Sequence, residues 1–289
     1  MMRGPGNWAV AVRTPKGDIA QVSKTIDSPM ARHRVWRLPI IRGVIALGES
    51  LAIGFRALSI SAQYAAQEEG ADGEEVETEI PRSVIIVGFV FAIGFALALF
   101  KVGPALITGL LPVENGTYFV LLEGLIRVSI LVGYLALISL LPDLKRVFQY
   151  HAAEHKAINA FEAGEELEPE VVQRYSLIHP RCGTAFLLWV MVIAIFVYAA
   201  FGRLPWYWLI VTRIVFLPII AGIAYELIRF AGKHSDSRVL KVLLAPGLWL
   251  QRLTTREPSL DQIEVSIRAL REVLSLESKS GDSLVEVMA

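Results

Sequence analysis

Two histidines near the middle of the chain, His151 and His155, are separated by one turn of a helix in the segment His-Ala-Ala-Glu-His. Residues four apart project from the same side of an α-helix, so the two imidazoles could bind one metal ion, usually Zn²⁺. Glu154 lies close to the same face, where its carboxylate could act as a general base toward a metal-bound water. The order H-x-x-E-H is the inverted form of a metalloprotease motif.

A second segment, His-Pro-Arg-Cys-Gly, supplies two further ligands, His179 and Cys182. If His151, His155, His179 and Cys182 all bind the ion, the site is closed and structural. If three of them bind and Glu154 activates a water, the site is catalytic. Without a metal, His151 and Glu154 would hydrogen-bond at the end of a helix, and Cys182 would be a small buried apolar residue.

The composition favours a membrane protein. Of the 289 residues, 54% are hydrophobic and 19% are charged, and the net charge is zero, so bulk charge indicates no DNA partner. A single cysteine excludes an internal disulfide and fits a reducing compartment. The polar N-terminus resembles no secretory signal peptide.

Four apolar runs predict a transmembrane bundle within residues 83–237. They lie near 83–103, 119–141, 185–201 and 207–230, and crossing a bilayer takes about 20 residues. Lys and Arg concentrate before residue 83, between 142 and 184, and after 228. The positive-inside rule therefore places both termini and the segment 142–184 on the cytoplasmic side of the membrane, with both ligand segments on one face.

Three charged residues fall inside these runs: Glu123, Arg127 and Arg213. Such residues are costly in lipid and normally face partners. We predict that Glu123 approaches Arg213 or Arg127 and so locks the bundle. The alternative is a polar pocket for an anionic headgroup.

The flanking segments predict smaller elements. Residues 1–36 favour a cytoplasmic β-hairpin, with strands near 8–13 and 19–22. Residues 37–66 favour an amphipathic helix in the membrane interface, because charges recur every seven residues at Arg42, Glu49 and Arg56; a true span is the alternative. Residues 67–82 form an acidic linker.

The last segment, 238–289, is expected to be cytoplasmic. It comprises a proline-broken amphipathic element at 239–253, a soluble helix at 258–276 and a disordered tail after Ser278. The apolar stripe of the soluble helix must pack either on its own domain or on a partner.

Several motifs together resemble those of the bacterial YqhQ-like membrane proteins. They are Met1–Pro5, Arg42-Gly43 with Glu49-Ser50, His151–Glu162, His179–Thr184, Tyr225-Glu226 and Ala245–Gln251, and they cover nearly the whole chain. The resemblance implies a polytopic inner-membrane protein. It implies no activity beyond that of a predicted metal-dependent enzyme, a label that rests on the same His and Glu residues.

The predicted fold is mostly α: a polytopic bundle of about four transmembrane helices, with an interfacial helix, an N-terminal β-hairpin and cytoplasmic helices. One hypothesis is a Zn²⁺-dependent hydrolase acting on a membrane peptide or lipid at the cytoplasmic interface. Another is a non-enzymatic scaffold or biogenesis factor that engages the ribosome or the protein-insertion apparatus. A transporter is a third, but no repeat or discontinuous helix pair supports it. Membrane lipids are expected partners in each case.

Overall fold

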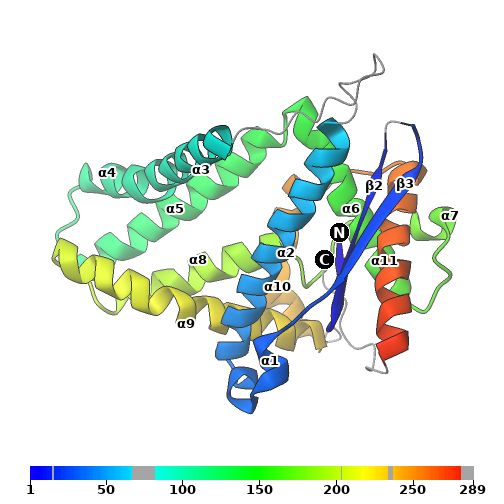
Figure 1. The fold of residues 1–289 in the computed structure, drawn as a ribbon. Helices are drawn as coiled ribbons and strands as arrows, with labels where there is room; N and C mark the ends of the chain where they lie inside the picture. The colour runs from blue at the N-terminus through cyan, green and yellow to red at the C-terminus, as the bar shows by residue number, and fades with distance from the viewer. Residues whose placement is uncertain (15, 67–81, 203, 234–236, 281–289) are drawn as a thin grey trace.

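The computed structural model describes the chain except for residues 15, 67–81, 203, 234–236 and 281–289. The predicted acidic linker therefore falls outside the described residues apart from Arg82, as do His234, Asp236 and the chain beyond 280. The described part is mostly helical and has two ends of different character (Figure 1). One end holds a small sheet with its covering helices, and the other holds long apolar helices.

The sheet begins with the predicted hairpin, which is confirmed. Strands β2 (Asn7–Arg13) and β3 (Ile19–Thr25) pair antiparallel, and the short β1 (Met2–Arg3) adds a third strand in the order β1-β2-β3. Side chains alternate between the two faces of β2. Ala9 packs toward α11 (Leu260–Ser280), and Trp8 and Val10 pack toward α2 (Ile41–Ala66), so the sheet lies between two helices.

The helix α11 packs on its own domain, which decides between the two expectations for its apolar stripe. Its buried side chains Ile263, Ile267, Leu270 and Val273 form one core with β1, β2 and α6 (Pro142–Glu162). The short α7 (Pro169–Val172) closes the same core through Val172. The helix α6, which carries the histidine motif, is therefore held from one side by α11.

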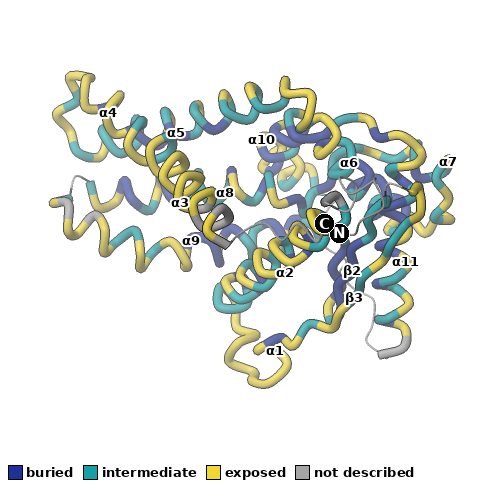
Figure 2. The backbone as a smooth tube through the Cα atoms, turned by 45° about the horizontal axis from the view of Figure 1, so that its top comes forward, coloured by how far each residue is buried: buried dark blue, intermediate teal, exposed yellow. Residues whose placement is uncertain are grey.

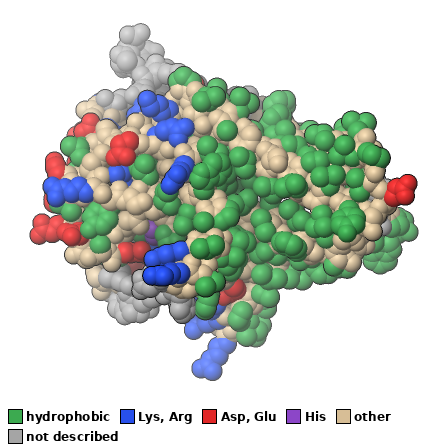
Figure 3. Space-filling view, turned by 180° about the vertical axis from the view of Figure 1, so that it is seen from behind, with side chains coloured by type: hydrophobic (Ala, Val, Ile, Leu, Met, Phe, Trp, Pro, Cys, Tyr) green, Lys and Arg blue, Asp and Glu red, His purple; other side chains and the backbone are tan. Residues whose placement is uncertain are grey.

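The apolar end is built from α3 (Arg82–Leu97), the π-helical turn η2 (Ala98–Val102), α4 (Gly103–Gly109), α5 (Gly116–Ile138), α8 (Gly183–Ala199) and α9 (Trp206–Lys233). The start of α5 is set by Asn115, whose side chain caps the helix by accepting hydrogen bonds from two backbone amides. The exposed residues along α3 and α4 are visible in Figure 2. Hydrophobic side chains cover this end of the molecule, whereas most charged side chains on the same face gather at the other end (Figure 3).

Among the described residues, four helices are long and apolar enough to cross a membrane: Ile41–Tyr64, Val90–Gly109, Gly116–Ile138 and Ile210–Gly232. Three of them overlap the predicted spans 83–103, 119–141 and 207–230, the first of which begins and ends later than predicted. The predicted span at 185–201 is instead the 17-residue apolar helix α8, which is shorter than the others. The predicted interfacial helix, α2, reaches the length and composition of a span, which was its alternative interpretation.

The predicted proline break near residue 246 was wrong. The helix α10 (Arg238–Thr254) continues through Pro246, which lies on its exposed face. Tertiary packing holds the helix together on its other face. A Cβ added to Gly247 would stand 3.0 Å from the Ala185 side chain, so α10 lies directly against the first turn of α8. Two short elements, α1 (Pro29–Arg32) and η1 (Arg34–Arg37), connect the sheet to α2.

Candidate metal centre

One face of α6 points toward the loop that joins α7 to α8. The residues His151, His155, Asn159 and Glu162 are spaced by four, four and three positions, which places them along one side of the helix. The loop residues opposite this face are those from Gln173 to Cys182, and Cys182 is the N-cap of α8. The sequence therefore brings the two predicted ligand segments together through one helix face and one loop.

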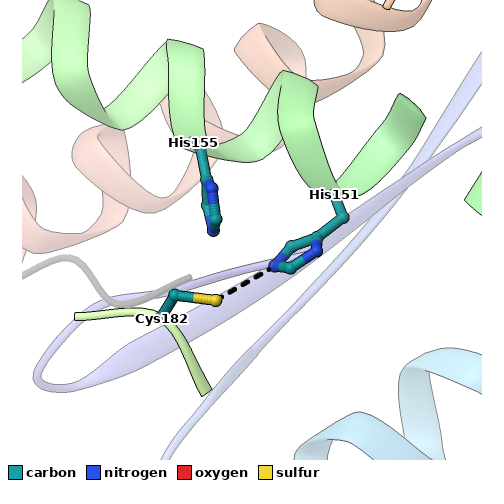
Figure 4. A group of neighbouring side chains, drawn as sticks. All are labelled: His151, His155 and Cys182. Carbon is teal, nitrogen blue, oxygen red and sulfur yellow. Dashed lines mark hydrogen bonds between the residues drawn. The ribbon is translucent and has the colours of Figure 1, made fainter. Parts of the chain in front are cut away.

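The structure brings three of the four predicted ligands into one group. The ligand atoms of His151, His155 and Cys182 all lie within 4.8 Å of one another. The imidazole of His151 points at the thiol, with 3.3 Å between Nε2 and Sγ (Figure 4). His155 and Cys182 are buried, and the two imidazole rings are 4.3 Å apart between centroids.

Both histidines are oriented through their other nitrogen. The Nδ1 of His151 lies 2.9 Å from the Thr254 carbonyl oxygen, and the Nδ1 of His155 lies 2.6 Å from that of Leu177. A carbonyl only accepts, so each Nδ1 carries the proton and donates, which leaves each Nε2 to face the group. The Nε2 of His155 is buried without a hydrogen-bond partner. Metal-binding histidines typically have this arrangement, with the second nitrogen fixed by a carbonyl.

The protonation states of the metal-free group suit a thiolate. Burial alone would raise the pKa of the Cys182 thiol, but the hydrogen bond with His151 and the two neighbouring imidazoles of His151 and His155 hold that pKa well below its usual value. Burial alone would lower the pKa of His151, but the hydrogen bond to Cys182, its negative charge and the Thr254 carbonyl raise it to about 9. The thiolate and imidazole nitrogen are ligands that Zn²⁺ prefers, so the group fits this ion.

The fourth predicted ligand, His179, lies beside the group rather than in it. Its ring centroid is 6.0 Å from that of His155, and its Nε2 is 3.5 Å from a Glu162 oxygen. Burial, and secondarily the nearby His155, lower its pKa to about 4, so the ring is neutral. Its backbone is held by the buried Gln251, which accepts from the His179 amide at 3.0 Å and donates to its carbonyl at 2.9 Å.

The predicted general base, Glu154, is not among the ligand atoms of the group. Its carboxylate contacts the amino group of Met1, and its negative charge acts on His151. The side chain lies on α6 between the two histidines, at the edge of the site and only partly buried. This position leaves Glu154 outside the ligand set and next to it.

Sequence reasoning missed the residues that hold the loop. Lys156 is almost fully buried and donates to the carbonyls of Gln173 at 2.6 Å and Tyr175 at 2.9 Å. Asn159 donates to two further loop carbonyls, those of Ser176 and Ile178. The sequence contained a signal for both residues, because Lys156 directly follows His155 and Asn159 lies one helical turn further along α6.

A largely apolar cavity of about 590 Å³ lies on the other side of this loop. The loop residues Ile178 and Pro180, which flank His179, form one wall, and α10 forms another with Leu244 and Leu248. Two cationic side chains, Lys241 and Arg252, also line it. The three clustered ligands are not among its lining residues, so His179 and its neighbours separate the cavity from the group.

The fold and this group define a class of protein. It is mostly helical, with membrane-length apolar helices at one end and the group of His151, His155 and Cys182 at the N-terminus of α8. Within that class, residues 38–276 match the family described as "Protein of unknown function (DUF1385)". The chain is 32% identical over 290 residues to the "Uncharacterized protein YqhQ" of Bacillus subtilis (strain 168), covering 97% of this chain and 91% of that protein. The chain therefore belongs to this family, as its motifs predicted. No solved structure matches it.

Proposed function

We propose that the protein is an integral membrane metalloprotein that binds Zn²⁺ through His151, His155 and Cys182. One observation carries the proposal: both Nδ1 atoms are fixed by backbone carbonyls, so both Nε2 atoms face one thiol, and that of His155 has no other partner. A buried imidazole nitrogen without a partner is costly, and a metal ion would satisfy it.

The ligand set favours a hydrolytic centre over a closed structural one. Three protein ligands leave a position open at a tetrahedral ion, and zinc with an open position lowers the pKa of a water to about 7. Glu154 lies on α6 beside His155, outside the ligand set, where it would take up a proton. His179 stays neutral beside the group, next to the loop residues Ile178 and Pro180 that line the cavity.

The cavity supports an amphiphilic substrate. Its walls are mainly apolar side chains of α10 and of the loop, and Lys241 and Arg252 offer charge for an anionic group. A membrane peptide or a lipid combines these two properties. We therefore propose that such a substrate enters from the membrane surface and reaches the centre past His179.

We place the apolar helices across the membrane, with both termini and the metal centre in the cytoplasm of a bacterium. The length and composition of α3–α4, α5 and α9 support this placement, together with the distribution of Lys and Arg. The shorter apolar helix α8 supplies the fourth crossing, which is needed for both termini to lie on one side. The helix α2 is the exception. Two of its side chains, Ile53 and Ala57, pack on the sheet. Arg3 of the sheet pairs with Glu49 and donates to the Ala46 carbonyl at 3.0 Å. A complete crossing by α2 would therefore draw the polar sheet into lipid.

Metal analysis of purified protein tests the proposal. The wild type should contain about one zinc ion per chain, and Cys182→Ser and His155→Ala should lose it. The exposed His33→Ala serves as the matched control and should retain it. Wild-type protein that holds no zinc and cannot take it up would overturn the metal centre and favour the alternative, a scaffold for the ribosome or the protein-insertion apparatus.

The variant Glu154→Gln separates catalysis from structure. This variant should keep both the zinc and the fold, while its rate of hydrolysis of membrane lipids or peptides falls by about 10²–10⁴-fold. Mass spectrometry of the products measures that rate. If Glu154→Gln loses the metal together with the stability, Glu154 is part of the structural centre and the hydrolytic assignment is wrong.

A further inference from the structure

A second polar group lies at the apolar end of the molecule, far along the helices from the metal centre. It consists of Lys101, Arg127 and Arg213 around the single carboxylate of Glu123, and we call it the cation cluster. Lys101 precedes the end of α4 by eight residues, Glu123 follows the α5 cap by eight, and Arg213 follows the start of α9 by seven. The three helices therefore present these side chains at a similar depth.

Glu123 is shared between two guanidinium groups. It forms an ion pair with Arg127, whose Nε also donates to the Phe100 carbonyl at 2.9 Å. Its Oε1 lies 3.6 Å from Nη2 of Arg213, so the predicted pairing is confirmed with both arginines. The Nη1 of Arg213 is buried without a hydrogen-bond partner, while the guanidinium carbon lies 4.8 Å from the centre of the Tyr198 ring.

Lys101 adds a third positive charge beside Arg127 and Arg213. It belongs to the π-helical turn η2, is exposed, and lies within electrostatic range of Arg213, Arg127 and Glu123. Isolated π-helical turns are frequent at functional sites. One carboxylate can lock two arginines, but it does not explain why a lysine joins them in an apolar surrounding, where an unbalanced charge is costly.

The surface around Lys101 faces lipid. Its neighbours Leu97, Val102 and Leu106 are exposed apolar side chains of the same helical segment. The segment from Arg82 to Gly109 is about 42 Å long at 1.5 Å per residue, and the hydrocarbon core is about 30 Å thick. Lys101 lies eight residues, or about 12 Å, before the end of this segment at Gly109, in the half of the span nearer that end, so its long side chain can extend toward the headgroups on that side.

We propose that the cation cluster binds the phosphate of an anionic phospholipid from the surrounding bilayer. Lys101 and the free Nη1 of Arg213 would donate charge-assisted hydrogen bonds to the phosphate oxygens, and Glu123 would keep the arginines in place. The lipid-facing position of Lys101 favours a lipid over free phosphate, because the approach to it passes over apolar side chains. The site is independent of the metal centre.

Native mass spectrometry in neutral detergent tests the proposal, with dioleoylphosphatidylglycerol as the probe. Lys101→Gln should weaken its binding about 10- to 100-fold, as expected for the loss of one charge-assisted hydrogen bond. Lys145→Gln, which removes an exposed lysine at the start of α6, is the matched control and should bind as the wild type does. Arg213→Gln should weaken binding as well. If Arg213→Gln fails to fold, Lys101→Gln alone still tests the proposal.

Two reference ligands complete the experiment. Dioleoylphosphatidylcholine should bind weakly to all variants, and inorganic phosphate should not displace the anionic lipid. Equal binding of both lipids, or equal loss in Lys101→Gln and Lys145→Gln, would overturn the proposal. Displacement by inorganic phosphate would also overturn it and would assign the cluster to a free anion.

Discussion

At the scale of single residues, Lys156 shows how the loop beside the candidate metal centre is kept in position. A buried ammonium needs partners on all sides, and Lys156 has two loop carbonyls and the carboxylate of Glu257, 2.9 Å away. The loop between Gln173 and Cys182 has no regular structure over most of its length, so side chains of α6 supply the hydrogen bonds that a sheet or helix would supply.

We predict that Lys156→Met destabilises the protein by about 2–4 kcal/mol, because it leaves two loop carbonyls without the donor that holds them on α6. Thermal or denaturant unfolding of the purified protein in detergent measures the loss. The exposed Lys145→Met on the same helix should stay within about 0.5 kcal/mol of the wild type. Equal stability of the two variants would show that the loop is held by other contacts.

At the scale of elements, the contact between α5 and α8 depends on a glycine. A Cβ added to Gly124 would stand 2.3 Å from a carbon of the Ile195 side chain, so only glycine permits this approach of the two helices. Cys182 is the N-cap of α8, so the packing of α8 against α5 also helps to fix the position of the Cys182 thiol.

Two alanine substitutions on α5 separate this packing from helix propensity. Gly124→Ala should destabilise the protein by about 1–3 kcal/mol through overpacking. Gly133→Ala, nine residues further along the same helix, meets nothing within 4 Å and should leave stability unchanged or raise it by up to about 1 kcal/mol. Unfolding midpoints in the same detergent provide the comparison, and a fall for both variants would contradict the packing argument.

The spacing of residues predicted the elements that depend on local pattern. His151 and His155 share a helix face, β2 and β3 pair as a hairpin, and the α11 stripe is buried, because each follows from a period of 3.6 or 2. The spacing of His179 and Cys182 could not reveal that only Cys182 enters the group. That outcome depends on Gln251, which fixes the His179 backbone from α10, more than 70 residues away.

Tertiary packing also decided one element that the sequence described incorrectly, and it added a contact that local pattern could not predict. Pro246 predicted a break, yet Gly247 packs on Ala185 and the helix continues. The charges of α2 predicted an interfacial helix. The structure adds that Glu49 pairs with Arg3 of the sheet, a contact between segments whose register no local pattern specifies.

At the scale of the whole molecule, charge and hydrophobicity separate along the long dimension (Figure 3). The polar end contains the sheet, α11 and α6, and the apolar end contains α3–α4, α5 and α9. The group of His151, His155 and Cys182 lies between them, at the start of α8. If the apolar end lies in the membrane as proposed, a centre at this border would be reached from the membrane surface, which is the reason for proposing an amphiphilic substrate.

The proposed topology gives the last prediction. Single cysteines introduced at positions 20, 165 and 280 should react with a membrane-impermeant maleimide only after the cells are opened, because these positions are placed in the cytoplasm. A cysteine at position 115, between α4 and α5, should react in intact cells. The native Cys182 is buried and should add little background.

A cysteine in place of the exposed Gln63, near the end of α2, decides how this helix is placed. If α2 lies in the interface, Gln63→Cys should behave like position 20, because Ile53 and Ala57 pack on the same sheet that contains residue 20. If α2 crosses the membrane, position 63 should label from outside while position 20 does not. Labelling of position 165 in intact cells would contradict the placement of the metal centre on the cytoplasmic side, since this position follows α6 directly.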